Sequence, residues 1–132
     1  MKRFCGVLPV LLVIVAATGA QGDPVMECGN QFGSQVEIGD CLADVEKNVD
    51  ASIEVILGFA MNSARELDTV TERDVAVPAL EAGQVAWAAY RDRHCEYVGS
   101  TFGGGSGTGI AIRGCRIEHG RARADILMGF AQ

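Results

Sequence analysis

The sequence lacks several patterns that would define a fold or an activity at once. It has no internal repeat and no sustained alternation of apolar and polar residues, which argues against repeat architectures and β-folds. No Cys-x-x-Cys pair occurs, so a zinc site built from its cysteines is disfavoured. No pair of carboxylates is placed so as to separate an acid from a base, and we therefore expect no enzymatic activity.

Positive charge is also scarce. Lys and Arg number 11 against 17 Asp and Glu, and without Lys2 and Arg3 nine basic residues would face 17 acidic ones, a net charge of −8. This balance disfavours nucleic acid and anionic membrane surfaces and favours cationic partners. Six arginines cluster in the C-terminal half, and we interpret them first as partners in intramolecular ion pairs. They are Arg91, Arg93, Arg113, Arg116, Arg121 and Arg123.

The longest apolar run lies at the start of the chain. It extends from Phe4 to Ala17, and Thr18-Gly19-Ala20 supplies the small residues that signal peptidase requires. We predict a signal peptide over residues 1–20, a mature start near Gln21, and a periplasmic or secreted protein without stable membrane insertion. The run is short for a membrane span, and an uncleaved anchor is the alternative.

Cleavage would remove Cys5 and leave an even set of four cysteines. Four cysteines allow three pairings. We favour the two bridges that close short loops, because these form with little entropic cost: Cys28–Cys41 and Cys95–Cys115. Each bridge would stabilise the fold by about 3 kcal/mol. A zinc ion held by the four thiolates is the competing interpretation.

Apolar residues at three- and four-residue steps predict helices over most of the remaining chain. Residues 21–33 look irregular, and Ser34 with Glu37 then forms a capping box that begins a long helix. The expected helices run from Ser34 to about Asp68, from about Val77 to Val98 and from Ile110 to Met128. The sequence therefore predicts one all-α domain over residues 21–132, a small bundle of about three helices held by two disulfides.

A stretch rich in glycine and serine, residues 99–109, separates the last two helices. It lacks the Lys of a phosphate-binding loop and no strand precedes it, which disfavours a nucleotide site. The cysteines on either side make it a tethered presentation loop or, alternatively, a slack connector. Phe102, a large apolar residue amid glycines, must either pack inward or contact a partner. The candidate partner-binding residues are Ser100, Thr101, Phe102, Ser106, Thr108, Arg113 and Arg116.

The histidines and the aromatic pair of the second helix indicate no chemistry by themselves. His94 adjoins Cys95, but adjacent helical residues point about 100° apart, and Cys95 is expected to be oxidised. His119 has no partner at a recognisable metal spacing. Trp87 and Tyr90 are interpreted first as core packing and second as a ligand-stacking platform. We predict no metal site and no cofactor.

Two stretches of the sequence resemble a known family. Residues 34–41 read Ser-Gln-Val-Glu-Ile-Gly-Asp-Cys, and residues 84–95 carry Gln-x-x-Trp-x-x-Tyr-Arg-x-x-x-Cys before the Gly/Ser-rich loop and a further cysteine. Over about residues 28–128 the chain resembles the LprI-type lysozyme inhibitor family of small exported bacterial domains. Gly120 stands where that family usually has a threonine. The matching motif residues are Gln84, Trp87, Tyr90, Arg91, Arg123 and Leu127.

The resemblance implies a helical, disulfide-held domain that binds lysozyme-type muramidases and blocks their cleft. Animal-type lysozymes are strongly cationic and cleave sugars with two carboxylates, so an acidic inhibitor would be steered toward them. The 99–109 loop or its flanks would offer hydroxyl, amide or arginine donors to those carboxylates. A non-inhibitory protein-interaction module of the cell envelope is the alternative, and an envelope hydrolase is disfavoured.

Overall fold

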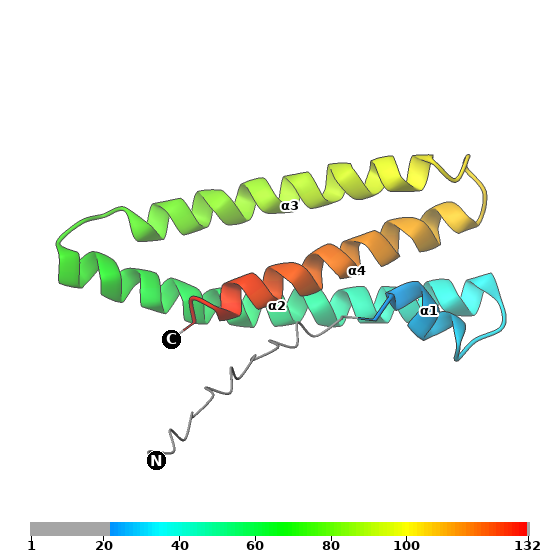
Figure 1. The fold of residues 1–132 in the computed structure, drawn as a ribbon, viewed down its shortest axis with the longest axis horizontal. Coiled ribbons are helices and arrows are strands. Elements are labelled where there is room, and N and C mark those ends of the chain that lie inside the picture. Colours follow the sequence, from blue (N-terminus) through cyan, green and yellow to red (C-terminus); the bar gives the residue numbers. More distant parts are fainter. Residues whose placement is uncertain (1–21, 132) are drawn as a thin grey trace, which may run out of the picture.

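The computed structural model describes residues 22–131, and this part of the chain forms four helices. Helix α1 (Pro24–Gly29) is short and α2 (Gln35–Thr71) is long, and α3 (Ala76–Ser100) and α4 (Gly107–Met128) follow. In Figure 1, α4 lies between α2 and α3, and α1 lies beside the first turns of α2. The predicted all-α fold is confirmed, whereas the predicted signal peptide, residues 1–20, lies outside the described residues.

The start of α2 follows the capping box that the sequence predicts. The Oγ atom of Ser34 accepts a hydrogen bond from the backbone N–H of Glu37 at 3.2 Å, and the Glu37 carboxylate accepts one from the Ser34 N–H at 3.2 Å. Hydrogen bonds from Ser34 hold the pKa of the Glu37 carboxyl below its ordinary value. The helix ends at Thr71 rather than near Asp68, and Glu72 terminates it with a left-handed φ of 52°.

Helix α3 is capped by a side chain from the preceding helix. Its own N-cap residue, Val75, provides no side-chain hydrogen bond. Instead, the Asp68 carboxylate accepts hydrogen bonds from the backbone N–H groups of Val75, Ala76 and Val77 at 3.1, 2.8 and 3.0 Å. The bonds from Val77 and Ala76 are the main reason that the pKa of Asp68 is lowered. This single carboxylate therefore ties the end of α2 to the start of α3.

Two expectations about the connecting segments are wrong. Residues 21–33 were expected to be irregular but contain α1, which begins at Pro24 and is capped by Asp23 through the Val25 N–H at 2.8 Å. The expected 99–109 connector is shorter, because α3 continues to Ser100 and α4 begins at Gly107. Glycine costs a helix only about 1 kcal/mol per residue relative to alanine, which packing between α3 and α4 can offset.

Both predicted disulfides are confirmed, and each joins neighbouring helices. Cys28–Cys41 links α1 to α2 with Cα atoms 6.0 Å apart, and Cys95–Cys115 links α3 to α4 with Cα atoms 5.5 Å apart. Two apolar clusters complete the core. Their buried members are Cys28, Leu42 and Ile117 in the first cluster and Ile53, Ala60 and Leu127 in the second. Since each cluster contains residues of α2 and α4, this helix pair forms the centre of the fold.

The close approach of α4 to α2 depends on Gly120, which is buried. A Cβ atom added at this position would lie 2.5 Å from Cγ1 of Val49, much nearer than the spacing of about 3.5–4.0 Å at which carbon atoms pack. The β-branched Val49 has few rotamers with which to move away. The absence of a side chain at Gly120 therefore permits a tight contact between α4 and α2.

None of the helices within residues 22–131 has the length and hydropathy that crossing a membrane requires.

Candidate functional site

The turn between α3 and α4, residues 101–106, lies at the same end of the molecule as the start of α2 (Figure 1). Gly103 and Gly104 have φ angles of 68° and 82°, a left-handed conformation that favours glycine. The side chain of Phe102 does not pack inward, since 55% of this residue is exposed. This turn, hereafter the α3–α4 turn, thus presents a large apolar side chain to solvent.

The hydroxyl groups around the α3–α4 turn differ in whether they are available to form a hydrogen bond with a partner. Those of Ser100 and Thr101 donate to backbone carbonyl oxygens of α3, at 2.6 and 2.7 Å. The Oγ1 atom of Thr108 is buried and has no hydrogen-bond partner. Ser106 occupies the N-cap position of α4, is exposed and makes no side-chain capping bond. Of these four predicted contact residues, Ser106 is therefore the one best placed to bond to a partner.

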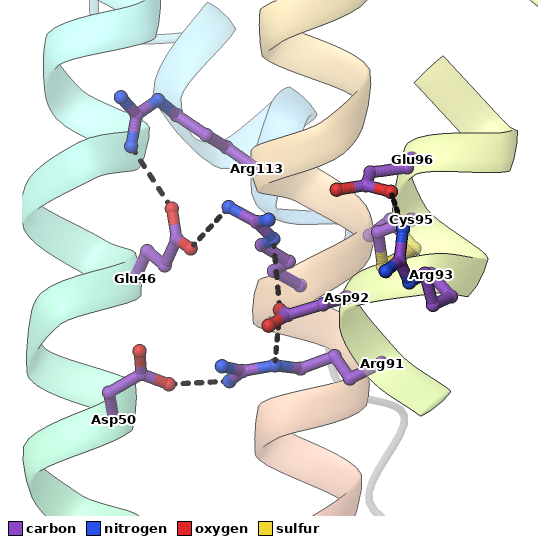
Figure 2. Close-up of polar contacts among 10 residues, drawn as sticks. Glu46, Asp50, Arg91, Asp92, Arg93, Cys95, Glu96 and Arg113 are labelled. Atoms are coloured by element: carbon purple, nitrogen blue, oxygen red, sulfur yellow. Dashed lines mark hydrogen bonds and ion pairs between the residues drawn. A yellow bond between two sulfur atoms is a disulfide. The ribbon is translucent and has the colours of Figure 1, made fainter. Parts of the chain in front are cut away.

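The predicted contact residues Arg113 and Arg116 face α2 and share the carboxylate of Glu46. Their Nη1 atoms lie 3.0 and 3.6 Å from its two oxygens, and Figure 2 shows Glu46 directed toward Arg113. The neighbouring Arg91 of α3 reaches Asp50 of α2 at 2.6 Å. These ion pairs bind α3 and α4 to the same side of α2, so the two guanidinium groups of α4 are already engaged within the chain.

The remaining arginines of the C-terminal cluster also have polar partners inside the molecule. Arg121 forms a two-pronged contact with Glu27 of α1, with Nη2–Oε2 2.7 Å and Nη1–Oε1 3.0 Å, and the hydrogen bond from Arg121 lowers the pKa of Glu27. Arg93 pairs with Glu96 within α3 at 3.4 Å. The interpretation of the clustered arginines as partners in intramolecular ion pairs is thus confirmed for five of the six, whereas Arg123 bonds to the amide of Gln84. Several exposed carboxylates make no ion pair among residues 22–131: Asp40, Asp44, Glu54, Glu66 and Glu81.

Four residues of the sequence motif form one connected group between α3 and α4. The Arg123 Nε–H donates to Gln84 Oε1 at 2.9 Å. The guanidinium carbons of Arg91 and Arg123 lie 4.9 and 5.8 Å from the Trp87 ring centroid, within the ~6 Å range of cation–π attraction. Trp87 also packs against the core, as expected, and Leu127 is fully buried. These motif residues therefore stabilise the fold rather than form an exposed site.

Tyr90, the exposed residue of the motif, packs with both histidines. Its ring stacks on His94 with centroids 5.4 Å apart and an interplanar angle of 16°. His119 lies edge-on to both rings, 5.0 Å from His94 and 5.7 Å from Tyr90. His119 has no partner at a recognisable metal spacing in the sequence, but the pairing of α3 with α4 brings it next to His94 in the structure. No local pattern in the sequence indicates this cluster.

The pKa of His119 is lowered from its ordinary value. Partial burial of the ring is the main cause, and the positive charges of His94 and Arg91 act in the same direction. The adjacent Glu118 opposes them. As a result, the imidazole of His119 stays neutral to a lower pH than the imidazole of a free histidine side chain does.

Comparison with known proteins identifies the family. A sequence profile described as "Lysozyme inhibitor LprI" matches residues 28–127. The chain belongs to the LprI lysozyme inhibitor family. The LprI family is one of inhibitors rather than enzymes, which agrees with the expectation of a non-enzymatic protein. An uncharacterised protein of Rhizobium meliloti (strain 1021) is 28% identical over 128 residues, covering 93% of this chain and 91% of its own length. No solved structure gives a significant match.

Proposed function

We propose that this LprI-family chain is exported, begins near Gln21 after cleavage, and inhibits a cationic lysozyme-type muramidase by occupying its cleft. The observation that carries the proposal is the match to the lysozyme inhibitor family over residues 28–127. Two disulfides suit an oxidising compartment outside the cytoplasm. The protein would then act in the periplasm or as a secreted protein, where it could meet a lysozyme.

Surface charge supports a cationic partner. The arginines of α3 and α4 contact acidic or amide groups of the same chain, so they add little positive potential to the surface. Near the start of α2, at the same end as the α3–α4 turn, Glu37, Asp40 and Asp44 are exposed. An acidic surface attracts a basic enzyme over a distance, raises the association rate and loses this effect as salt is added.

The α3–α4 turn is the part of the surface that best suits insertion into a cleft. Its two central residues, Gly103 and Gly104, have no side chains, which keeps the turn narrow. Phe102 provides an exposed apolar group, and Ser106 provides a hydroxyl donor at the N-terminal end of α4. The partial positive charge at a helix N-terminus also favours nearby carboxylates. The Ser106 hydroxyl would donate a hydrogen bond to an active-site carboxylate of the muramidase, and the N-terminal end of α4 would attract the negative charge of that carboxylate.

A pair of phenylalanine variants tests the role of the turn. Phe102→Ser should raise the concentration needed for half-inhibition of lysozyme by about tenfold or more, since exposed aromatic anchors often dominate binding. Phe59→Ser is the matched control, because Phe59 lies on α2 and is 57% exposed, against 55% for Phe102. The measurement is lysis of a peptidoglycan suspension by a cationic animal-type lysozyme, with circular dichroism confirming that both variants are folded.

Equal potency of Phe102→Ser and the unaltered chain would exclude the turn as the inserted segment while leaving inhibition itself intact. If the unaltered chain does not inhibit lysozyme but captures another envelope protein, the alternative of a non-inhibitory interaction module is favoured instead. Arg113 and Arg116 remain predicted contacts under this proposal, provided that lysozyme binding releases them from Glu46.

A further inference from the structure

The histidines of this chain lie together although they are far apart in the sequence. The whole sequence contains two histidines, and the structure places their rings 5.0 Å apart on facing helices. His94 belongs to α3 and His119 to α4. Both side chains are partly buried, so solvent can reach them. A nitrogen atom of each ring and the Sγ atom of Cys115 lie within 4.8 Å of one another.

The surroundings hold this pair in place. His94 directly precedes Cys95, whose disulfide to Cys115 fixes the spacing of α3 and α4 with a Cα–Cα distance of 5.5 Å. His119 lies four residues after Cys115, and residues separated by four lie on one face of a helix. The stacked ring of Tyr90 restrains the orientation of His94. The two helix segments that carry the imidazoles are therefore held together before any ligand arrives, which reduces the entropic cost of binding one.

We propose that His94 and His119 bind one divalent ion of a late first-row transition metal, such as Zn²⁺. A zinc ion about 2.0–2.1 Å from each nitrogen requires only a modest approach of the two rings from the spacing in the structure. Rotation of the side chains within the partly exposed cluster can supply it. The sulfur of Cys115 is engaged in a disulfide and is not a thiolate ligand, so water completes the coordination.

Local electrostatics are compatible with a cation at this position. Neutral imidazole is the metal-binding form, and each of the two rings offers one nitrogen atom to the ion. Glu118 adds negative charge beside His119. The neighbouring cation Arg91 is paired with Asp50 and Asp92. Imidazole ligands favour Zn²⁺, Ni²⁺ and Cu²⁺ over Mg²⁺ and Ca²⁺, which defines the expected selectivity.

Titration of the disulfide-bonded, tag-free mature chain with Zn²⁺ tests the site. Calorimetry should show one bound ion that excess Mg²⁺ does not displace. His94→Gln and His119→Gln should each weaken binding by at least about tenfold, since the loss of a mere outer-shell partner of a metal ligand already has an effect of this size. Glu96→Gln is the control: it removes an exposed carboxylate of α3 two residues from His94 and should retain the affinity. A thiol assay should confirm that no free cysteine contributes.

Histidine ring signals in NMR spectra provide a measurement on the unaltered chain. Both imidazoles should shift together and saturate at one equivalent of Zn²⁺. The proposal is overturned if only one ring responds, if no saturable binding occurs, or if Glu96→Gln weakens binding as much as the histidine variants do. The last result would assign the ion to the acidic surface. None of these outcomes depends on whether the chain inhibits lysozyme.

Discussion

Replacement of Ile117 by alanine should lower the free energy of unfolding by about 2–5 kcal/mol, the range observed for large-to-small changes in protein cores. Ile117 has no exposed surface and packs with Leu42 of α2 and Cys28 of α1. Its removal leaves a cavity where three helices meet, and the Cys28–Cys41 disulfide limits the collapse of α1 into that space. Urea denaturation followed by circular dichroism measures the change directly.

Ile126→Ala is the matched control for this prediction. Ile126 lies on the same helix and is 54% exposed, so its truncation removes little buried area. Its effect should remain near the ±0.5 kcal/mol that is usual for surface substitutions. Equal losses for the two variants would contradict the assignment of Ile117 to the core, and would mean that α4 packs through another face.

Removal of the Cys95–Cys115 disulfide, by Cys95→Ala together with Cys115→Ala, is expected to cost about 3 kcal/mol. The bridge closes a sequence separation of 20 residues and holds α3 against α4 next to the α3–α4 turn. Its loss therefore increases the freedom of the unfolded chain and also loosens the proposed binding segment. Thermal or urea unfolding measures the loss of stability. Lysozyme inhibition by the folded fraction measures the effect of loosening the binding segment.

The other disulfide separates these two effects. Cys28–Cys41 closes 13 residues, so its removal with Cys28→Ala and Cys41→Ala should cost a similar free energy, about 3 kcal/mol. It joins α1 to α2 and does not flank the α3–α4 turn. The two double variants should be compared at a temperature where both remain folded. Only the loss of Cys95–Cys115 should then reduce the inhibition of lysozyme per folded molecule. Equal inhibition of lysozyme by the two double variants would contradict the idea that the Cys95–Cys115 bridge positions the α3–α4 turn.

Features that depend on nearby residues could be predicted from the sequence. The capping box of Ser34 and Glu37 is a local motif, and the start of α2 follows it. The disulfides were predicted because short loops form with little entropic cost, and both are present. Apolar spacing located the three long helices to within a few residues. In each case the interacting residues are close together in the chain or repeat at the helical period.

Features that depend on helix packing could not be predicted in the same way. The cap of α3 comes from Asp68 in the previous helix, so no residue adjacent to that helix indicates it. The Glu46 carboxylate forms ion pairs with two arginines of α4. Predicting these pairs requires knowledge of which faces of α2 and α4 meet. The pairing of His94 with His119 likewise follows from the register of α3 against α4. Periodicity identifies a helix face but not its neighbour.

The positions of the motif residues distinguish the residues that stabilise the LprI fold from the exposed residues that are free to contact a partner. Gln84, Trp87 and Arg123 contact one another, and Leu127 is buried. Substitutions at these positions would primarily lower the stability of the fold, and any loss of inhibition would follow from that. The exposed α3–α4 turn, by contrast, contains none of the motif residues. Experiments on inhibition should therefore be directed at the turn and its acidic neighbours, with stability measured for every variant.

The decisive measurement of the proposed function is inhibition of a cationic animal-type lysozyme by the purified, disulfide-bonded chain from residue 21 to residue 132. We expect saturable loss of lytic activity as the chain is added, with weaker association as salt is raised because opposite charges are screened. Full lytic activity at low salt, in the presence of an excess of folded chain, would contradict the proposed inhibition of this class of lysozyme.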